Sequence, residues 1–235
     1  EKDCHGAVEK GHLMAASYGV ESLGDTNKYR LSFTVGGLLE PQGVLLARLF
    51  ADMTDITCDR VVGEDIVRVR KAAIDGNVLG MRSHTSNVRF VSETSKRLSA
   101  LSVREITYLA SAEASYDDRS ALMWVAMCRY YRIVGVFAKD VLRGNFLAGK
   151  ETVNKDDYDR FMRNAAMWHP EIEQLSELTY RKLRQNVFHA MDDARLTKGT
   201  DHEIVPALLS NGLLAILEDM ATAFEFFPMY VPSKF

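Results

Sequence analysis

The sequence RSALMWVAMCRYYRIVGVFAKDVL, residues 119–142, contains the longest strongly apolar uncharged run of the chain. Its first half is apolar on nearly every side of a helix, whereas a surface helix has one polar face. Asp117 and Asp118 precede it, and Lys139 and Arg143 lie near its end, which suits the helix dipole. The stretch predicts one long, largely buried helix at the centre of the protein.

Apolar residues at helical spacing predict further helices on both sides of this stretch. The expected helices cover about 38–52, 61–75, 83–100, 156–167, 176–194 and 206–224, with a short element at 170–175. Residues 195–205 give the one convincing hairpin signal, with its turn at 198–201. The predicted fold is therefore mainly α, with helix-turn-helix-like units. Helix, short helix, long helix and small hairpin, in that order, resemble a winged helix.

A segment with two glycines and several polar residues, 144–155, is the predicted boundary between two units. The expected organisation is a flexible tail at 1–28, an N-terminal helical domain at 29–148 and a C-terminal winged-helix-like domain at 149–235.

Composition excludes several classes of protein. The 235 residues are 47% hydrophobic and 26% charged, as in an ordinary globular protein. The net charge of -3 excludes a general polycation, so any anion-binding face must be a local patch. The longest apolar run, 120–128, is far shorter than the roughly 20 residues of a membrane helix. We expect no membrane span and no signal peptide, and a cytoplasmic protein.

Catalytic and metal-binding patterns are weak in this sequence. Phosphate-binding glycine loops and the His-Glu-x-x-His zinc motif are absent. Asp201, His202 and Glu203 are adjacent in a predicted turn and strand, where neighbouring side chains point to different faces. The three cysteines are an odd number, are widely spaced and form no Cys-x-x-Cys pair. Cys128 fits a buried core position better than the position of a nucleophile. We expect no enzyme activity, no cofactor and no metal.

Ser176 is a good N-cap residue for the helix predicted at 176–194. This helix has an apolar face and a basic, amide-rich face. Arginine and lysine neutralise phosphates, and glutamine and arginine can make two hydrogen bonds to a base edge. The candidate DNA-binding residues here, with the hairpin tip, are Arg181, Lys182, Arg184, Gln185 and Lys198. A solvated surface helix is the alternative, because acidic residues on the same helix temper its charge.

A second basic segment lies at 81–104. It carries five basic residues against a single acid, Glu93, which is a net charge of +4 in a chain of -3. Such segregation attracts a polyanion to one face. Its candidate DNA-binding residues are Arg82, Arg89, Lys96 and Arg97. A structural use, in which these arginines pair with acids of neighbouring helices, stays open.

Several short segments together resemble the BrxA family of bacteriophage exclusion (BREX) systems. They are YRLSF at 29–33 with GGLL at 36–39, NVL at 77–79 with SNVR at 86–89, KRLSAL at 96–101, the helix from Tyr130 to Phe137, and LSELT at 175–179 with Lys182-Leu183. The resemblance covers about 29–217. It implies an accessory protein of a phage-defence complex, whose partners are other BREX proteins and in which the catalytic functions belong to larger components.

Members of this family are described as similar to the RNA-binding NusB protein and, in places, as inner-membrane proteins. The basic segments favour the nucleic-acid description, and the short apolar runs disfavour a membrane. The system distinguishes host from phage DNA, so double-stranded DNA is the predicted partner. The alternatives are a protein-interaction adaptor, which binds partners through its basic stripes, and a NusB-like RNA-binding protein, which would need exposed aromatic side chains.

Overall fold

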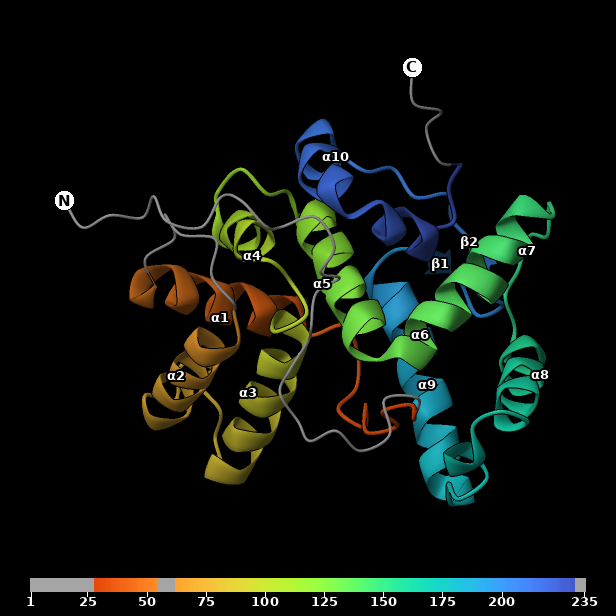
Figure 1. Ribbon diagram of the computed structural model, residues 1–235, viewed down its shortest axis with the longest axis horizontal. Helices are drawn as coiled ribbons and strands as arrows, with labels where there is room; N and C mark the ends of the chain where they lie inside the picture. Colours follow the sequence, from red (N-terminus) through yellow and green to blue (C-terminus); the bar gives the residue numbers. More distant parts are fainter. Residues whose placement is uncertain (1–27, 55–61, 231–235) are drawn as a thin grey trace, which may run out of the picture.

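A computed structural model describes residues 28–54 and 62–230, and these form a mainly helical protein, as predicted (Figure 1). The α-helices are α1 (Glu40–Met53), α2 (Val62–Asp75), α3 (His84–Leu98), α4 (Val103–Ala110), α5 (Tyr116–Tyr130), α6 (Arg132–Phe137), α7 (Gly144–Leu147), α8 (Lys155–Ala166), α9 (Glu177–Asp193) and α10 (Asn211–Leu217). A π-helix, η1 (Ala138–Arg143), two 3-10 helices, η2 (Pro170–Ile172) and η3 (Glu218–Phe226), and two strands, β1 (Thr197–Lys198) and β2 (Glu203–Ile204), complete the list. The predicted tail at 1–28 lies outside the described residues except for Lys28.

Helix α5 is the centre of the core. Every side chain from Ser120 to Cys128 is buried, which confirms the prediction for this half of the apolar stretch. Helices α1, α3 and α4 pack against it on one side, and α6 to α9 lie on the other (Figure 1). Trp124, at its middle, is fully buried and donates a hydrogen bond from Nε1 to the carbonyl of Phe226, 2.9 Å away.

The prediction of one continuous helix over 119–142 is wrong. Helix α5 ends at Tyr130, and the segment from α6 through α7 continues at an angle of 114° to it. Tyr131 lies between them with φ -102° and ψ 83°, outside the helical region. Its hydroxyl donates to the buried carboxylate of Glu93, with 2.8 Å to each oxygen. Tertiary contact at the tyrosine thus accompanies a bend that apolar periodicity does not reveal.

Gly135 permits the bend. A Cβ at this residue would lie 2.7 Å from the carbonyl oxygen of Cys128 and 3.1 Å from the ring of Phe226. Only glycine therefore lets the first turns of α6 approach the end of α5 this closely.

Side-chain caps mark the starts of five helices. Ser83, Ser102, Ser115, Asn154 and Ser176 each accept a hydrogen bond from a backbone N–H in the first turn of the following helix. The sequence predicted the cap at Ser176 but not the short helix α4. The last helix is shorter than predicted, because α10 begins only at Asn211 and η3 replaces its second half.

The hairpin forms as predicted, with Thr197 opposite Ile204 and Lys198 opposite Glu203. A third segment lies along the other edge of β2. The N–H of Ile204 donates to the carbonyl of Glu151 at 2.7 Å, and the N–H of Val153 donates to that of His202 at 3.2 Å. An isolated bridge between Thr152 and Glu203 completes this pairing, so β2 is flanked by β1 and by residues 151–153.

Buried side chains from both predicted units form one hydrophobic cluster. It contains residues of α1 and α3 together with residues of α8, α9 and α10. The division at 148/149 stays a prediction, and extensive packing crosses it.

An extended segment, residues 28–39, joins the two sides, and we call it the strap. It lies between α3 and α9 (Figure 1), and its Phe33 side chain is buried. The side-chain amide of Asn186 on α9 donates to the carbonyl of Phe33 at 2.8 Å, and the N–H of Leu38 donates to Asp193 at 2.9 Å. The strap therefore links α3 and α9 through its own backbone.

Within the described ranges, no single helix is both long and apolar enough to cross a membrane. Helix α5 and the segment from α6 to α7 meet that criterion only as a pair, across their 114° bend.

Gly135→Ala should destabilise the protein by about 1–3 kcal/mol, because the added methyl group meets backbone and a buried ring rather than a movable side-chain end. Urea unfolding followed by circular dichroism measures this. Gly144→Ala is the matched control: Gly144 is helical, with φ -58°, and its Cβ would have no neighbour nearer than 3.9 Å. The control should be neutral or stabilising, and equal effects of the two changes would contradict this account of the bend.

Candidate nucleic-acid interface

Arg89 and Lys96 form an exposed basic surface on α3, with Arg82 in the turn just before the helix. Arg89 and Lys96 are seven residues apart and so share one face of the helix. Arg89 donates from Nη2 to the carbonyl of Thr34 in the strap, at 3.3 Å. None of these three cations forms an ion pair within the described part of the chain, and we call them the α3 patch.

Arg97, the fourth candidate in this segment, does not belong to an exposed patch. Its side chain is 0% exposed, so the expectation that it faces nucleic acid is wrong in this fold. Nε donates to Glu93 at 3.1 Å, and Nη1 donates to the carbonyls of Gly37 and Leu38 at 2.9 and 3.0 Å. Burial lowers the pKa of Arg97, and the charge of Glu93 opposes that shift.

Arg97 therefore has a structural use, but its partner is an acid of its own helix and not of a neighbouring helix. A sequence signal for this pair was present. Glu93 is the only acid in the segment 81–104 and lies one helical turn before Arg97, at the spacing of an intrahelical ion pair. The burial of this pair depends on the strap and on Tyr131, which are distant in sequence.

Arg97→Ala should destabilise the fold by about 3–5 kcal/mol, since it leaves the buried Glu93 carboxylate without its cation. Lys96 precedes Arg97 in the chain and is exposed. Lys96→Ala also removes one positive charge, but it should change the free energy of unfolding by less than about 0.5 kcal/mol. Denaturant unfolding of both variants tests the assignment. A small effect of Arg97→Ala would show that this ion pair is dispensable.

The candidates on α9 and the hairpin are more often paired with acids. Arg181 contacts Glu177 at 2.6 Å, with both side chains exposed, and Lys198 contacts Glu203 at 2.9 Å. Gln185 is exposed and lies 3.4 Å from the ring of His189. Lys182 is exposed and, among the described residues, has no ion pair.

Arg184 has a structural partner. Its side chain is 23% exposed, and Nη1 donates to both oxygens of Asp159 on α8, at 2.8 and 2.6 Å. Tyr180 donates to the same carboxylate at 2.8 Å, and burial together with Asp159 raises the pKa of Tyr180. These contacts hold α8 against α9 and give Arg184 a structural role, and its contact with DNA stays a prediction.

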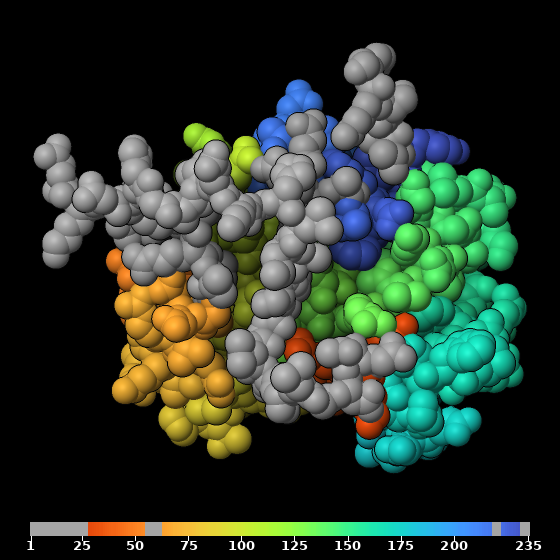
Figure 2. All heavy atoms as spheres, viewed as in Figure 1, coloured from red at the N-terminus to blue at the C-terminus, as the bar shows by residue number. Residues whose placement is uncertain are grey.

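The basic faces of α3 and α9 are turned toward the same strap. On α3, Arg89 and Arg97 both donate to strap carbonyls. On α9, Asn186 donates to the strap, and Lys182 lies one turn earlier on the same face. Orange-red atoms of the strap reach the surface shown in Figure 2. The α3 patch and Lys182 thus lie on the two helices that donate hydrogen bonds to the strap.

Two exposed arginines near the strap, Arg30 and Arg132, were missed by the sequence analysis. Arg30 lies over the ring of Tyr130 at 4.7 Å, and Arg132 lies over the ring of Tyr29 at 5.4 Å. Each arginine is separated from other basic residues in sequence, and no helical period connects them. Only the fold brings them together.

Two side chains that could carry chemistry, those of Cys128 and His202, are buried or paired. Burial raises the pKa of the Cys128 thiol well above its usual value. His202 Nδ1 lies 3.3 Å from Asp192, and its ring packs on Phe188. In residues 28–54 and 62–230, no group of three or more His, Cys, Asp or Glu side chains could hold a metal ion.

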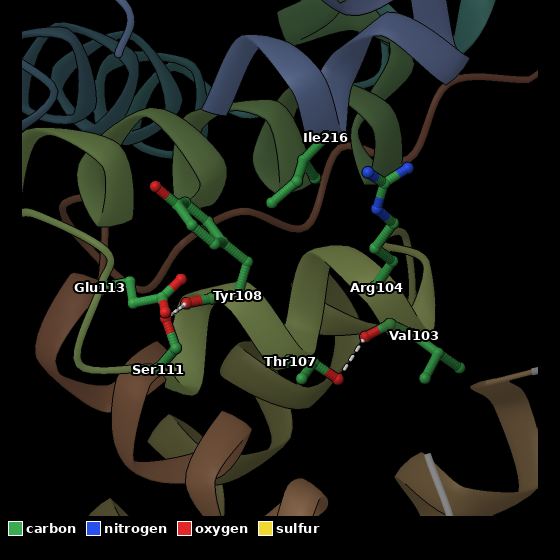
Figure 3. A pocket seen from close by; sticks show the side chains of 7 residues that line it. All are labelled: Val103, Arg104, Thr107, Tyr108, Ser111, Glu113 and Ile216. Carbon is green, nitrogen blue, oxygen red and sulfur yellow. Dashed lines mark hydrogen bonds between the residues drawn. The ribbon is translucent and has the colours of Figure 1, made fainter. Parts of the chain in front are cut away.

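A hollow of about 370 Å³ lies between α4 and Ile216 of α10 (Figure 3). Thr107 and Ser111 line it, but their hydroxyls donate to the carbonyls of Val103 and Tyr108 in their own helix. Tyr108 donates to Asp118 at 3.1 Å. These three hydroxyl groups therefore serve α4 and its neighbour α5.

Comparison with known proteins identifies the family. The profile of the BrxA family matches residues 27–220, which is most of the chain, and the protein belongs to this family. BrxA proteins are associated with BREX phage-defence systems, as the resemblance implied. None of the curated proteins compared with the chain matches it.

The fold is also similar to that of a solved structure. The crystal structure of an uncharacterized protein from Magnetospirillum magneticum superposes with a TM-score of 0.68 at 14% sequence identity, covering 84% of this chain and 97% of the other. At this identity the similarity concerns the fold alone.

Proposed function

We propose that this BrxA-family protein binds double-stranded DNA, without catalysing a reaction, as an accessory component of a BREX defence system. One observation carries the proposal: the faces of α3 and α9 next to the strap carry exposed cations that have no carboxylate partner among the described residues. A duplex lying along the strap would meet both faces at once.

The order of elements after α5 supports a duplex-binding role. A helical segment from α6 to α7 is followed by residues 151–153, then by α8, α9 and the hairpin, and β2 pairs with both β1 and residues 151–153. This order resembles that of a winged helix, in which the helix before the hairpin enters the major groove. In the proposed complex, α9 would be that helix.

The exposed stripe of α9 has the side chains that such a helix uses. Leu178, Arg181, Lys182 and Gln185 follow one another on its outer face, toward its N-terminal half. Arginine, lysine and glutamine bind phosphates and base edges, and an apolar side chain can contact the thymine methyl group. The ion pair between Arg181 and Glu177 is exposed on both sides, so exchange of Glu177 for a phosphate costs little.

The charge distribution also favours a polyanion. The chain has a net charge of -3, but the segment 81–104 is basic, and its buried Arg97–Glu93 pair contributes no net charge. The exposed residues Arg82, Arg89 and Lys96 therefore give this face a positive charge. Duplex binding at such a face releases counterions and weakens with salt.

The direct test is fluorescence anisotropy with duplex DNA, single-stranded DNA and RNA of equal length, each at several salt concentrations. We expect preference for the duplex, with log affinity falling linearly with log salt. Preference for RNA would favour a NusB-like activity, and absence of binding to all three would contradict the proposal.

Arg89→Ala combined with Lys96→Ala should lower the salt slope of duplex binding by about two, at about 0.9 for each lost phosphate contact. Both side chains are exposed, so the free energy of unfolding should stay nearly constant. A slope equal to that of the wild type in a folded variant would remove the α3 patch from the interface.

Lys182→Ala and Arg184→Ala separate binding from stability on α9. Lys182→Ala should weaken duplex binding and lower its salt slope by about one, with unchanged unfolding. Arg184→Ala should destabilise the protein by about 1–3 kcal/mol, because Asp159 loses its cation. Anisotropy measures the binding, and urea unfolding measures the stability. A destabilised Lys182→Ala variant with wild-type binding, or a stable Arg184→Ala variant with weakened binding, would contradict the assignment of the two residues.

A protein-interaction adaptor is the second candidate, and one observation favours it. Met167, Trp168 and Leu178, near the connection between α8 and α9, are 71%, 79% and 80% exposed. Large apolar side chains this exposed are typical of protein contacts. Such an adaptor would form a stable complex with another BREX protein and would show no duplex affinity at moderate salt.

A further inference from the structure

Arg30 and Arg132 come from different elements and lie close to the bend of the central helix. Arg30 belongs to the strap, and Arg132 is the first residue of α6, directly after Tyr131. Both side chains are exposed. Neither forms an ion pair with the residues that the structure describes, in contrast to Arg181, Arg184 and Arg195.

Aromatic rings hold both guanidinium groups. Arg30 lies 4.7 Å from the centre of the Tyr130 ring, and Arg132 lies 5.4 Å from that of Tyr29. Tyr29 is itself fixed, because its ring packs at 3.9 Å on His169 and its N–H donates to Glu171 at 2.7 Å. A guanidinium over a ring uses the ring face and keeps its N–H donors, whereas a carboxylate partner would occupy them.

One acid lies near this cluster, and it has partners of its own. Glu171 accepts from the N–H of Tyr29, and one of its oxygens lies 3.3 Å from His169 Nδ1. Burial acts to raise the pKa of Glu171, but the Tyr29 N–H and His169 lower it overall. Its charge is thus directed at His169 and the strap backbone, and it forms no ion pair with Arg132.

The cluster shares the strap with the two basic helices. Arg89 on α3 donates to Thr34, Asn186 on α9 donates to Phe33, and Arg30 lies on the same short strap. We infer that Arg30 and Arg132, supported by Tyr130 and Tyr29, form a phosphate-binding centre that connects the α3 patch to Lys182 along one duplex backbone. This inference rests on the proposed duplex binding and adds its central contact.

The test compares Arg30→Ala/Arg132→Ala with a control of equal charge, Lys139→Ala/Arg195→Ala. Lys139 and Arg195 are also exposed, but they are paired with Glu225 and Asp117 at 2.8 and 2.6 Å. Anisotropy with a labelled duplex at several salt concentrations should show a salt slope lower by about two for the first pair. Its affinity should fall about tenfold or more. The control pair should stay within about twofold of the wild type.

Each arginine is also replaced alone, so that a folding defect of the double variant does not decide the result. Each single variant should lower the slope by about one. Arg30→Lys/Arg132→Lys, which retains the charges, should keep most of the slope. Folded variants with a wild-type slope, while Arg89→Ala/Lys96→Ala lowers it, would overturn this inference and leave the proposed function standing. A wild-type protein that does not bind duplex DNA would overturn both.

Discussion

The buried guanidinium of Arg97 is the contact on which the arrangement of this protein depends. It donates to Glu93 within α3 and to the carbonyls of Val35, Gly37 and Leu38 in the strap. Tyr131 completes the network through its hydroxyl on the Glu93 carboxylate. A charge fully removed from water is tolerated only when its partners are in place, so α3, the strap and the bend after α5 must form together.

This constraint also determines where the exposed charges lie. Arg97 is turned inward to the strap. Arg89 lies one helical turn before Glu93 and two turns before Arg97, where it is exposed and donates to the strap carbonyl of Thr34. The strap then reaches α9 through Phe33 and Leu38. One extended segment therefore sets the relative placement of the two basic helices, and any polyanion that binds both must follow it.

The two helices use their cations differently. On α3 the buried Arg97–Glu93 pair is structural, and the exposed Arg89 and Lys96 form no ion pair with the residues that the structure describes. On α9 the half-buried Arg184 holds α8, whereas Lys182 forms no ion pair within the same described ranges. Equal residue types at similar helical spacing thus have unequal roles. A basic residue belongs to an interface only where burial and carboxylate partners leave its donors available, and both depend on residues far away in the chain.

Periodicity and capping are local, so the sequence by itself determined the features that depend on them. These are the mainly helical class, the buried first half of the 119–142 stretch, the Ser176 cap and the hairpin. Short sequence segments also indicated the family. Only the tertiary structure decided three features: the bend at Tyr131, the burial of Arg97, and the placement of Arg30 and Arg132 over tyrosine rings. The reason is physical: each depends on partners more than 30 residues away in sequence, such as Glu93 for Tyr131, Gly37 for Arg97 and Tyr130 for Arg30. A local pattern carries no information about such distant partners until the chain has folded.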